Sequence, residues 1–213
     1  MRTLYCFVFI LFAFSFQAEA QSAKAFVKSG NIYFIQDNNQ TIQLTSAGLA
    51  HSPILSPDKK SIAFIKVGTD PLPEQCRNFA DTNSTYGKQI WIIDVEHKEE
   101  RLLVNYNFAC AKPMEMIIAP RHLTFSLDSK TLYFLTYAWT TSNALHAVNI
   151  ADAKQRYLLP ANSFAVATDE EYKGNLILNQ HRYFIGGGSY DWYWLFTPQG
   201  KEIGPLGEEP SIK

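Results

Sequence analysis

Several kinds of feature are missing from this chain of 213 residues. Beyond the first twenty residues, no apolar run approaches the ~20 residues that a membrane-spanning helix needs. Lysine plus arginine (19) nearly balance aspartate plus glutamate (20), without a basic stripe, which argues against nucleic acid or an anionic membrane as the partner. Nucleophile elbows, phosphate loops and zinc motifs are all absent from the sequence. We therefore expect no cofactor, no metal ion and no motif-based catalytic residue.

The longest apolar segment lies at the very start of the chain. Arg2 precedes an apolar run from Leu4 to Phe16, and Ala18-Glu19-Ala20 follows as a small-x-small site. This three-part pattern is typical of a secretory signal peptide, and the run is short for a membrane anchor. We expect cleavage after Ala20, a single domain over residues 21–213, and a periplasmic or secreted protein without membrane insertion.

Cysteine is scarce, with three residues in the whole chain. Cys6 lies inside the apolar run, which leaves Cys76 and Cys110 for the exported domain. An oxidising compartment makes a disulfide between them the default expectation. Metal binding is disfavoured because neither cysteine has a close Cys or His partner at ligand spacing.

An internal repeat is present instead. Residues 52–67 read SPILSPDKKSIAFIKV and residues 122–137 read HLTFSLDSKTLYFLTY, with a constant shift of 70 residues. Each combines an apolar strand, a Ser-x-Asp-x-Lys turn and an alternating strand with one buried face. Ser and Asp side chains favour such a turn because they bond the backbone two residues further on.

A second strand–turn–strand element follows each of these stretches, over residues 89–103 and 144–159. In that second element Arg101 aligns with Arg156. Further copies lie near both ends of the exported domain. The chain therefore divides into a half unit and three units of about four strands each, over residues 31–45, 50–104, 117–159 and 163–207.

This pattern resembles the TolB-like β-propeller repeat, a relative of the WD-type repeats. The blade of that family has a Ser-Pro-Asp-Gly-Lys turn, an Ile-Ala-Phe strand and an Ile-Trp-Val-Asp strand. Here Ser56-Pro57-Asp58-Lys59-Lys60, Ile62-Ala63-Phe64 and Ile90-Trp91-Ile92-Ile93-Asp94 match it. Lys59 and Ser129 stand where the family has glycine, and Leu127 stands for the proline. The resemblance is strong over residues 50–104, fair over 122–159 and weak elsewhere, and it implies a fold and export but no activity.

The expected fold is all-β, a small or incomplete β-propeller of about three full four-stranded blades plus an N-terminal half blade. Propellers usually have more blades than this chain can supply. The blades could close into a small four-bladed ring. Alternatively they could form an open arc, whose sheet edges must be covered, for example in a homodimer.

The strand order also predicts which loops share a face. If the strands of a blade are labelled a to d, the b–c and d–a loops emerge on the same side of an antiparallel meander. Cys76 lies in the b–c loop 68–88 and Cys110 in the d–a loop 105–121, so this labelling is consistent with the disulfide. The same face receives residues 138–143 and the glycine-rich stretch 186–191.

The glycine-rich stretch allows two interpretations. Gly186-Gly187-Gly188 would be a b–c turn between Tyr183-Phe184 and the strand 192–196, that is, a hairpin between two aromatic core strands. Alternatively, Tyr190, Asp191 and Trp192 would form the floor of a pocket together with Trp139. The candidate binding residues are Trp139, Tyr190, Asp191, Trp192, Arg77 and Phe79.

The leading functional prediction is an exported, non-catalytic binding or scaffold protein whose partner is another protein of the cell envelope. A second hypothesis is an inhibitor or immunity protein that blocks a cell-wall enzyme with the long 68–88 loop. A third is a hydrolase on the loop face, for which His51, Asp191 and Glu115 are the weak candidates. The five histidines have no partners at metal or catalytic spacing and favour structural roles.

Overall fold

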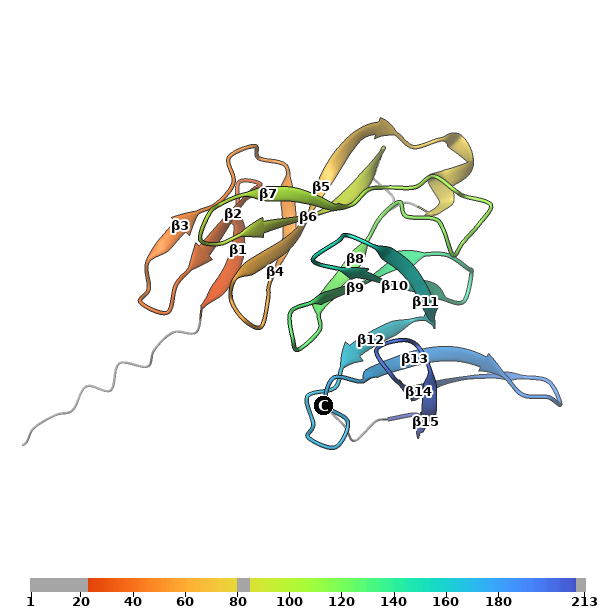
Figure 1. Ribbon diagram of the computed structural model, residues 1–213. Helices are drawn as coiled ribbons and strands as arrows, with labels where there is room; N and C mark the ends of the chain where they lie inside the picture. The colour runs from red at the N-terminus through yellow and green to blue at the C-terminus, as the bar shows by residue number, and fades with distance from the viewer. Residues whose placement is uncertain (1–22, 80–84, 210–213) are drawn as a thin grey trace, which may run out of the picture.

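The computed structural model describes residues 23–79 and 85–209, so the expected signal peptide and its cleavage site lie outside the described residues. The described residues form four antiparallel sheets, each a meander of strands in chain order (Figure 1). The sheets comprise β1 (Lys24–Lys28), β2 (Asn31–Ile35) and β3 (Thr41–Gln43); β4 (Ala50–Leu55), β5 (Ser61–Pro71), β6 (Tyr86–Asp94) and β7 (Glu100–Val104); β8 (Arg121–Phe125), β9 (Thr131–Tyr137), β10 (Asn143–Asn149) and β11 (Gln155–Ala161); and β12 (Ser163–Val166), β13 (Leu176–Tyr183), β14 (Ser189–Phe196) and β15 (Glu202–Gly207).

These sheets correspond to the repeat units expected from the sequence. Each of the three full units is a four-stranded sheet, and the expected half unit supplies β2 and β3 of the first sheet. The N-terminal prediction was short by one strand, because β1 pairs with β2 over five residues and makes this sheet three-stranded. Its sequence KAFVK carries no turn motif of the repeat, which is why the unit pattern missed it.

The four sheets are joined by three apolar interfaces. Side chains alternate along a strand, so a strand between two sheets contacts both. On β9, Leu132 and Phe134 pack in the cluster shared with the second sheet, while Tyr133 and Leu135 pack in the cluster shared with the fourth. A third cluster joins the first sheet to the second. Among the described residues no apolar cluster joins the first sheet to the last, and Figure 1 shows these two sheets at opposite ends of an open arc.

The Ser-x-Asp-x-Lys turns have the hydrogen bonds that the sequence predicts. Ser56 Oγ donates to Asp58 Oδ1 at 2.6 Å, and the amide of Lys60 donates to the same oxygen at 3.1 Å. The turn 126–130 repeats both bonds at the same distances. Desolvation raises the pKa of the Asp58 carboxyl, but the hydrogen bonds from Ser56 and from the Lys60 amide contribute to a net lowering of this pKa. The polar turns are therefore built to keep their carboxylates charged.

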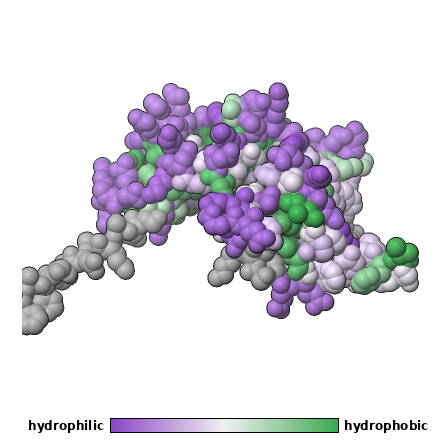
Figure 2. Space-filling model, turned by 60° about the horizontal axis from the view of Figure 1, so that its bottom comes forward, coloured by the Kyte–Doolittle hydropathy of each residue, from purple (hydrophilic) through white to green (hydrophobic). Residues whose placement is uncertain are grey.

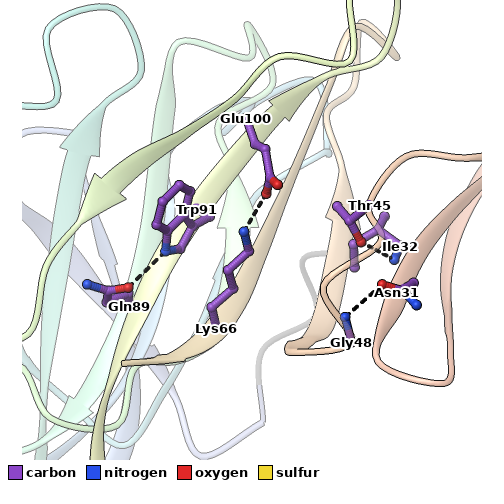
Figure 3. A network of polar contacts seen from close by, with 8 residues as sticks. All are labelled: Asn31, Ile32, Thr45, Gly48, Lys66, Gln89, Trp91 and Glu100. Carbon is purple, nitrogen blue, oxygen red and sulfur yellow. Dashed lines mark hydrogen bonds and ion pairs between the residues drawn. The ribbon is translucent and has the colours of Figure 1, made fainter. Parts of the chain in front are cut away.

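Between the first and second sheets, polar contacts supplement the apolar cluster. The amide of Gly48 donates to Asn31 Oδ1 at 2.9 Å, and the buried amide of Ile32 donates to Thr45 Oγ1 at 2.9 Å (Figure 3). Both bonds fix the segment that leads from β3 to β4. This segment satisfies backbone groups that the shorter first sheet would otherwise leave unpaired.

The second sheet carries an ion pair over a tryptophan. Lys66 Nζ lies 4.1 Å from the ring centroid of Trp91 and pairs with Glu100 Oε2 at 2.5 Å (Figure 3). The indole nitrogen of Trp91 donates to Gln89 Oε1 at 3.0 Å. Lys66 on β5, Gln89 and Trp91 on β6 and Glu100 on β7 take part, so the network links the three strands.

The aligned arginines of the repeat have the same structural role in two sheets. Arg101 on β7 donates through Nη2 to the backbone oxygen of Ile150 in the third sheet. Arg156 on β11 donates in the same way to the oxygen of Pro198 in the fourth sheet, at 3.3 Å. Each arginine thus ties the last strand of one sheet to a turn of the next.

Candidate functional site: the b–c loop face

The cysteines lie on one face, as the strand labels predict. Cys76 belongs to the 3₁₀ helix η1 (Glu74–Phe79), between β5 and β6, and Cys110 lies between β7 and β8. The two form a disulfide with a Cα–Cα distance of 5.4 Å, which confirms the expected pairing. The bond fastens the long b–c loop of the second sheet to the connection that leads into the third.

The described part of this loop packs inward. Leu72 and Cys76 are buried against Met116 and Ile118 of the 105–120 connection, and Phe79 packs on the same cluster. The cluster covers the junction of the second and third sheets. Arg77 is exposed on η1, so of the two candidates from this loop only Arg77 is fully open to solvent.

Gly68 and Gly87 leave room for the Tyr106 side chain to pack against the base of the loop. A Cβ on Gly68 would lie 2.3 Å from Tyr106 Cε1, and one on Gly87 would lie 2.6 Å from Tyr106 Cγ. The Tyr106 ring stacks on Phe108 with centroids 4.9 Å apart. Any side chain at these glycines would push the aromatic pair away, so the loop base requires them.

The connection between β13 and β14 is a protruding hairpin. The register pairs Tyr183 with Ser189, and the amide of Phe184 donates to the oxygen of Gly188 at 3.1 Å. Phe184 was expected on the strand, but it lies in the turn, because the strand ladder ends one residue earlier. Gly187 and Gly188 have φ of 98° and 83°, a region that favours glycine and explains their place at this turn.

The tip of this hairpin is apolar and exposed. Relative exposure is 69% for Tyr183, 54% for Phe184 and 110% for Ile185. Figure 2 shows hydrophobic surface at this projecting end of the molecule, at the right of the view. The expected hairpin is present, but its aromatic tip is not part of the core.

The four aromatic and acidic candidates lie in three different places. Tyr190 and Trp192 pack on the cluster between the third and fourth sheets, with ring centroids 5.1 Å apart. Asp191 points to the opposite face of β14, because successive residues of a strand alternate. Trp139 lies in the β9–β10 turn and packs edge-on against Tyr157 at 6.2 Å. Among the described residues, the ring contacts of Trp139 and those of Tyr190 involve different partners, so the two do not form one aromatic cluster.

A chain of polar groups runs from Arg121 in the third sheet to Asp191 in the fourth. Arg121 donates to Asn143 Oδ1 at 2.5 Å, and Asn143 Nδ2 donates to the oxygen of Asn162 at 3.2 Å. Asn162 Nδ2 in turn donates to Asp191 Oδ1 at 3.3 Å. The same oxygen lies 2.9 Å from His181 Nδ1. The chain spans the third and fourth sheets and fixes Asp191 as a partner of His181.

The tip residues and His181 were not among the sequence candidates. Counting outward from the three glycines would have paired residue 181 with residue 193, but the hairpin is centred on Gly186 and pairs His181 with Asp191. The solvent exposure of Tyr183 and Ile185 could not be predicted from the sequence either, because aromatic residues of strands are more often buried.

A hollow of about 360 Å³ lies at the base of the hairpin, lined in part by Leu159, Gln180 and Glu202. Arg182 lies beside it, donates to Gln180 Oε1 and to Glu202 Oε2, both at 2.6 Å, and stacks over Trp194 at 3.5 Å. The charged groups here are already paired with one another. The hollow is therefore poorly suited to hold a charged ligand.

The three hydrolase candidates lie apart in the chain fold. His51 is on β4 of the second sheet beside Ser52, Asp191 is on β14 with His181, and Glu115 pairs with Lys112 in a loop. Among the described residues there is no cluster of metal-ligating side chains. Within that same part of the chain, no helix is long and apolar enough to cross a membrane.

Comparison with known proteins is informative for the fold. No protein-family model and no curated protein sequence matches the chain. Dipeptidyl peptidase 4 from Porphyromonas gingivalis superposes with a TM-score of 0.53 at 12% identity, over 88% of this chain and 31% of that one. This chain is a partial β-propeller.

Two further solved structures are similar to this partial propeller. TolB from Acinetobacter baumannii gives a TM-score of 0.49 at 14% identity, over 88% of this chain and 42% of that one. The β-propeller domain of the Trilobed protease from Pyrococcus furiosus gives 0.49 at 16% identity, over 88% and 52%. The expected propeller fold is confirmed by the four antiparallel sheets and by the superposition on dipeptidyl peptidase 4. The chain spans no more than about half of each of these relatives.

Proposed function

We propose that this partial propeller is a non-catalytic binding protein of the cell envelope, and that the β13–β14 hairpin anchors it to another protein. The single observation that carries the proposal is the apolar hairpin tip of Tyr183, Phe184 and Ile185, which is 54–110% exposed. Large exposed apolar groups at one place mark interaction sites in soluble proteins. Location in the envelope is part of the proposal and is supported by the leader-like first twenty residues and by the disulfide.

The hairpin has the properties of a preformed anchor. Two backbone bonds, Phe184 to Gly188 and Gly187 to Phe184, hold the turn at 3.1 Å each. Behind the tip, Tyr190 packs on Phe184 with centroids 4.6 Å apart, and its other neighbour Trp192 reaches the core cluster. A tip that is already ordered loses less entropy on binding, and aromatic anchors dominate the energetics of protein interfaces.

A protein partner is favoured over a lipid surface by the charges around the hairpin. Segments that bind membranes combine an apolar edge with clustered Lys and Arg. Here the base of the hairpin pairs Arg182 with Glu202 and His181 with Asp191, and Glu208 and Glu209 follow. The net charge of the chain is −1. Such a surface has no attraction to anionic lipid.

The test places a photo-crosslinking amino acid at Ile185, in the cell that makes the protein. The matched control carries it at Ile203, which is 51% exposed on β15 of the same sheet. We expect one discrete protein adduct from position 185 and none from position 203. The adduct partner is then purified, and Phe184→Ser with Ile185→Ser should weaken its binding about 100-fold or more.

Other results would contradict the proposal. Equal adducts from both positions, or unchanged affinity of the double serine variant, would remove the hairpin as the anchor. Sedimentation of the purified protein with vesicles of phosphatidylglycerol and phosphatidylethanolamine, lost in the same variant, would show a lipid surface as the target instead.

The plug hypothesis gains no support from the loop. An inhibitory loop must protrude, whereas Leu72 and Cys76 are 6% and 0% exposed. The described part of the loop therefore serves to cover the junction between the second and third sheets.

A further inference from the structure

Within residues 23–79 and 85–209, no other sheet packs on the outward face of the first sheet. On this face Phe26 and Tyr33 stack with centroids 5.4 Å apart and Ile35 lies beside them, all three only partly buried. Residues of the same strands that alternate with these, such as Ile32 and Phe34, are buried against the second sheet. The outward face is therefore an apolar strip without a blade to cover it.

The last sheet has a corresponding outward face. Ile177 and Leu195 form a small cluster there with Tyr193, Leu206 and Tyr172. The three larger outer members are partly exposed, although the two at the centre are buried. In the third sheet the same side packs on the next blade, so this face has the position and the composition of a blade interface.

The charges at the two end faces are opposite. Lys24 and Lys28 flank Phe26 on the outward face of β1, and no acidic residue lies on the outward face of the first sheet. The last sheet is acidic around its outward face, although Lys173 pairs with Glu170 and His181 with Asp191, both at 2.9 Å. The acidic residues there are Asp169, Glu170, Glu171, Asp191, Glu208 and Glu209.

We propose that two copies of this chain close a ring, with the last sheet of each packed on the first sheet of the other. Both interfaces then have the head-to-tail direction in which the chain already stacks its own sheets. Two copies of four sheets give eight blades, which is within the usual range for propellers. A two-fold axis makes the two interfaces equivalent, and a head-to-tail contact that closes gives a ring instead of a filament. The opposite charges select this pairing over first-to-first or last-to-last contacts.

The test is the mass of the purified protein by light scattering over a concentration series. We expect a dimer, twice the mass of one chain. Lys24→Glu with Lys28→Glu should weaken it about tenfold or more, because two attractions become repulsions. Glu170→Lys with Glu171→Lys should do the same. Changing Lys98 and Lys154, which lie in turns of the second and third sheets, to Glu should have no effect.

Mixing the two weakened variants distinguishes this ring from other dimers. Each variant has one altered and one normal end face. In a mixed pair the two normal faces meet at one interface and the two altered faces meet at the other. Opposite charges therefore meet at both interfaces. The mixture should therefore recover the dimer with one copy of each variant. A monomer at all concentrations, masses above the dimer, or failure of the mixture to recover would each overturn the proposal. The hairpin variant with Ser at 184 and 185 should keep the dimer mass, so this result is independent of the proposed function.

Discussion

His146 offers the sharpest test of the packing in the third sheet. The side chain is 0% exposed, on β10, with its ring stacked on Phe134 at 5.1 Å. Gln155 Nε2 donates to Nδ1 at 2.9 Å, so the ring proton is on Nε2 and points to Thr136 Oγ1 at 3.0 Å. Its other aromatic neighbour is Tyr157, whose pKa burial raises to about 12 and which stays neutral. The site is built for an uncharged imidazole.

The consequence for stability follows from the pKa. Burial lowers the pKa of His146 from 6.5 to about 4. Between these pH values His146 is protonated in the unfolded chain but neutral in the folded chain. The free energy of unfolding therefore falls as the pH falls through this window. Above pH 6.5 the loss is absent, and below pH 4 it is complete. At ~1.4 kcal/mol per pH unit, the full loss is about 3 kcal/mol.

The assay is urea denaturation of the disulfide-bonded protein from pH 7.5 to pH 4.5, compared with His146→Gln, which cannot titrate. The gap between the two free energies of unfolding should shrink by about 2–3 kcal/mol as the pH falls. Exposed His97, whose pKa is raised by Asp94, contributes with the opposite sign but equally in both proteins. NMR titration of the wild-type imidazole provides a second measurement if the variant does not fold. A pKa near 6.5 for His146 would refute the reasoning.

Two further predictions concern the loop face. Gly68→Ala should destabilise the fold by about 1–3 kcal/mol in urea, since its Cβ would meet Tyr106, whereas Gly186→Ala, with open space around it, should change stability little; equal effects would contradict the steric argument. Replacing Cys76 and Cys110 with serine should lower the free energy of unfolding by about 3–4 kcal/mol on the chain-entropy model for a separation of 34 residues, and an unchanged midpoint would show that the loop cluster alone fixes this region.

Much of the fold was predictable because the repeat places turn chemistry at fixed positions. Ser126 and Asp128 mark a turn as clearly as Ser56 and Asp58 do, so four sheets could be counted from the chain. Strand β1 was not predicted, because no such turn precedes it. The sequence also could not decide between a closed ring and an open arc. Closure depends on small angles between neighbouring sheets, which no local sequence pattern encodes.

The site was less predictable. The shared face of the cysteines followed from strand order alone, which is a topological property. The direction of single side chains did not: Asp191 and its neighbours Tyr190 and Trp192 alternate across β14 and cannot line one pocket floor from the same face. Exposure of Ile185 depends on how far the hairpin extends beyond the neighbouring sheet, which requires the assembled structure.

The two residues that stand where the family turn has glycine illustrate how the sequence is adapted to this assembly. Lys59 and Ser129 both have φ of 61°, the left-handed conformation for which the family uses glycine. Each side chain reaches a neighbouring sheet: Lys59 Nζ bonds Asp37 at 2.9 Å, and Ser129 Oγ accepts from the amide of Asp58 at 3.1 Å. Glycine could make neither contact. A single hydrogen bond is worth about 1 kcal/mol, similar to the cost of the left-handed backbone, and an exposed ion pair contributes little. The substitutions are therefore close to neutral for each turn alone, and their specific effect is to fix the angle between consecutive sheets, on which the shape of the arc depends.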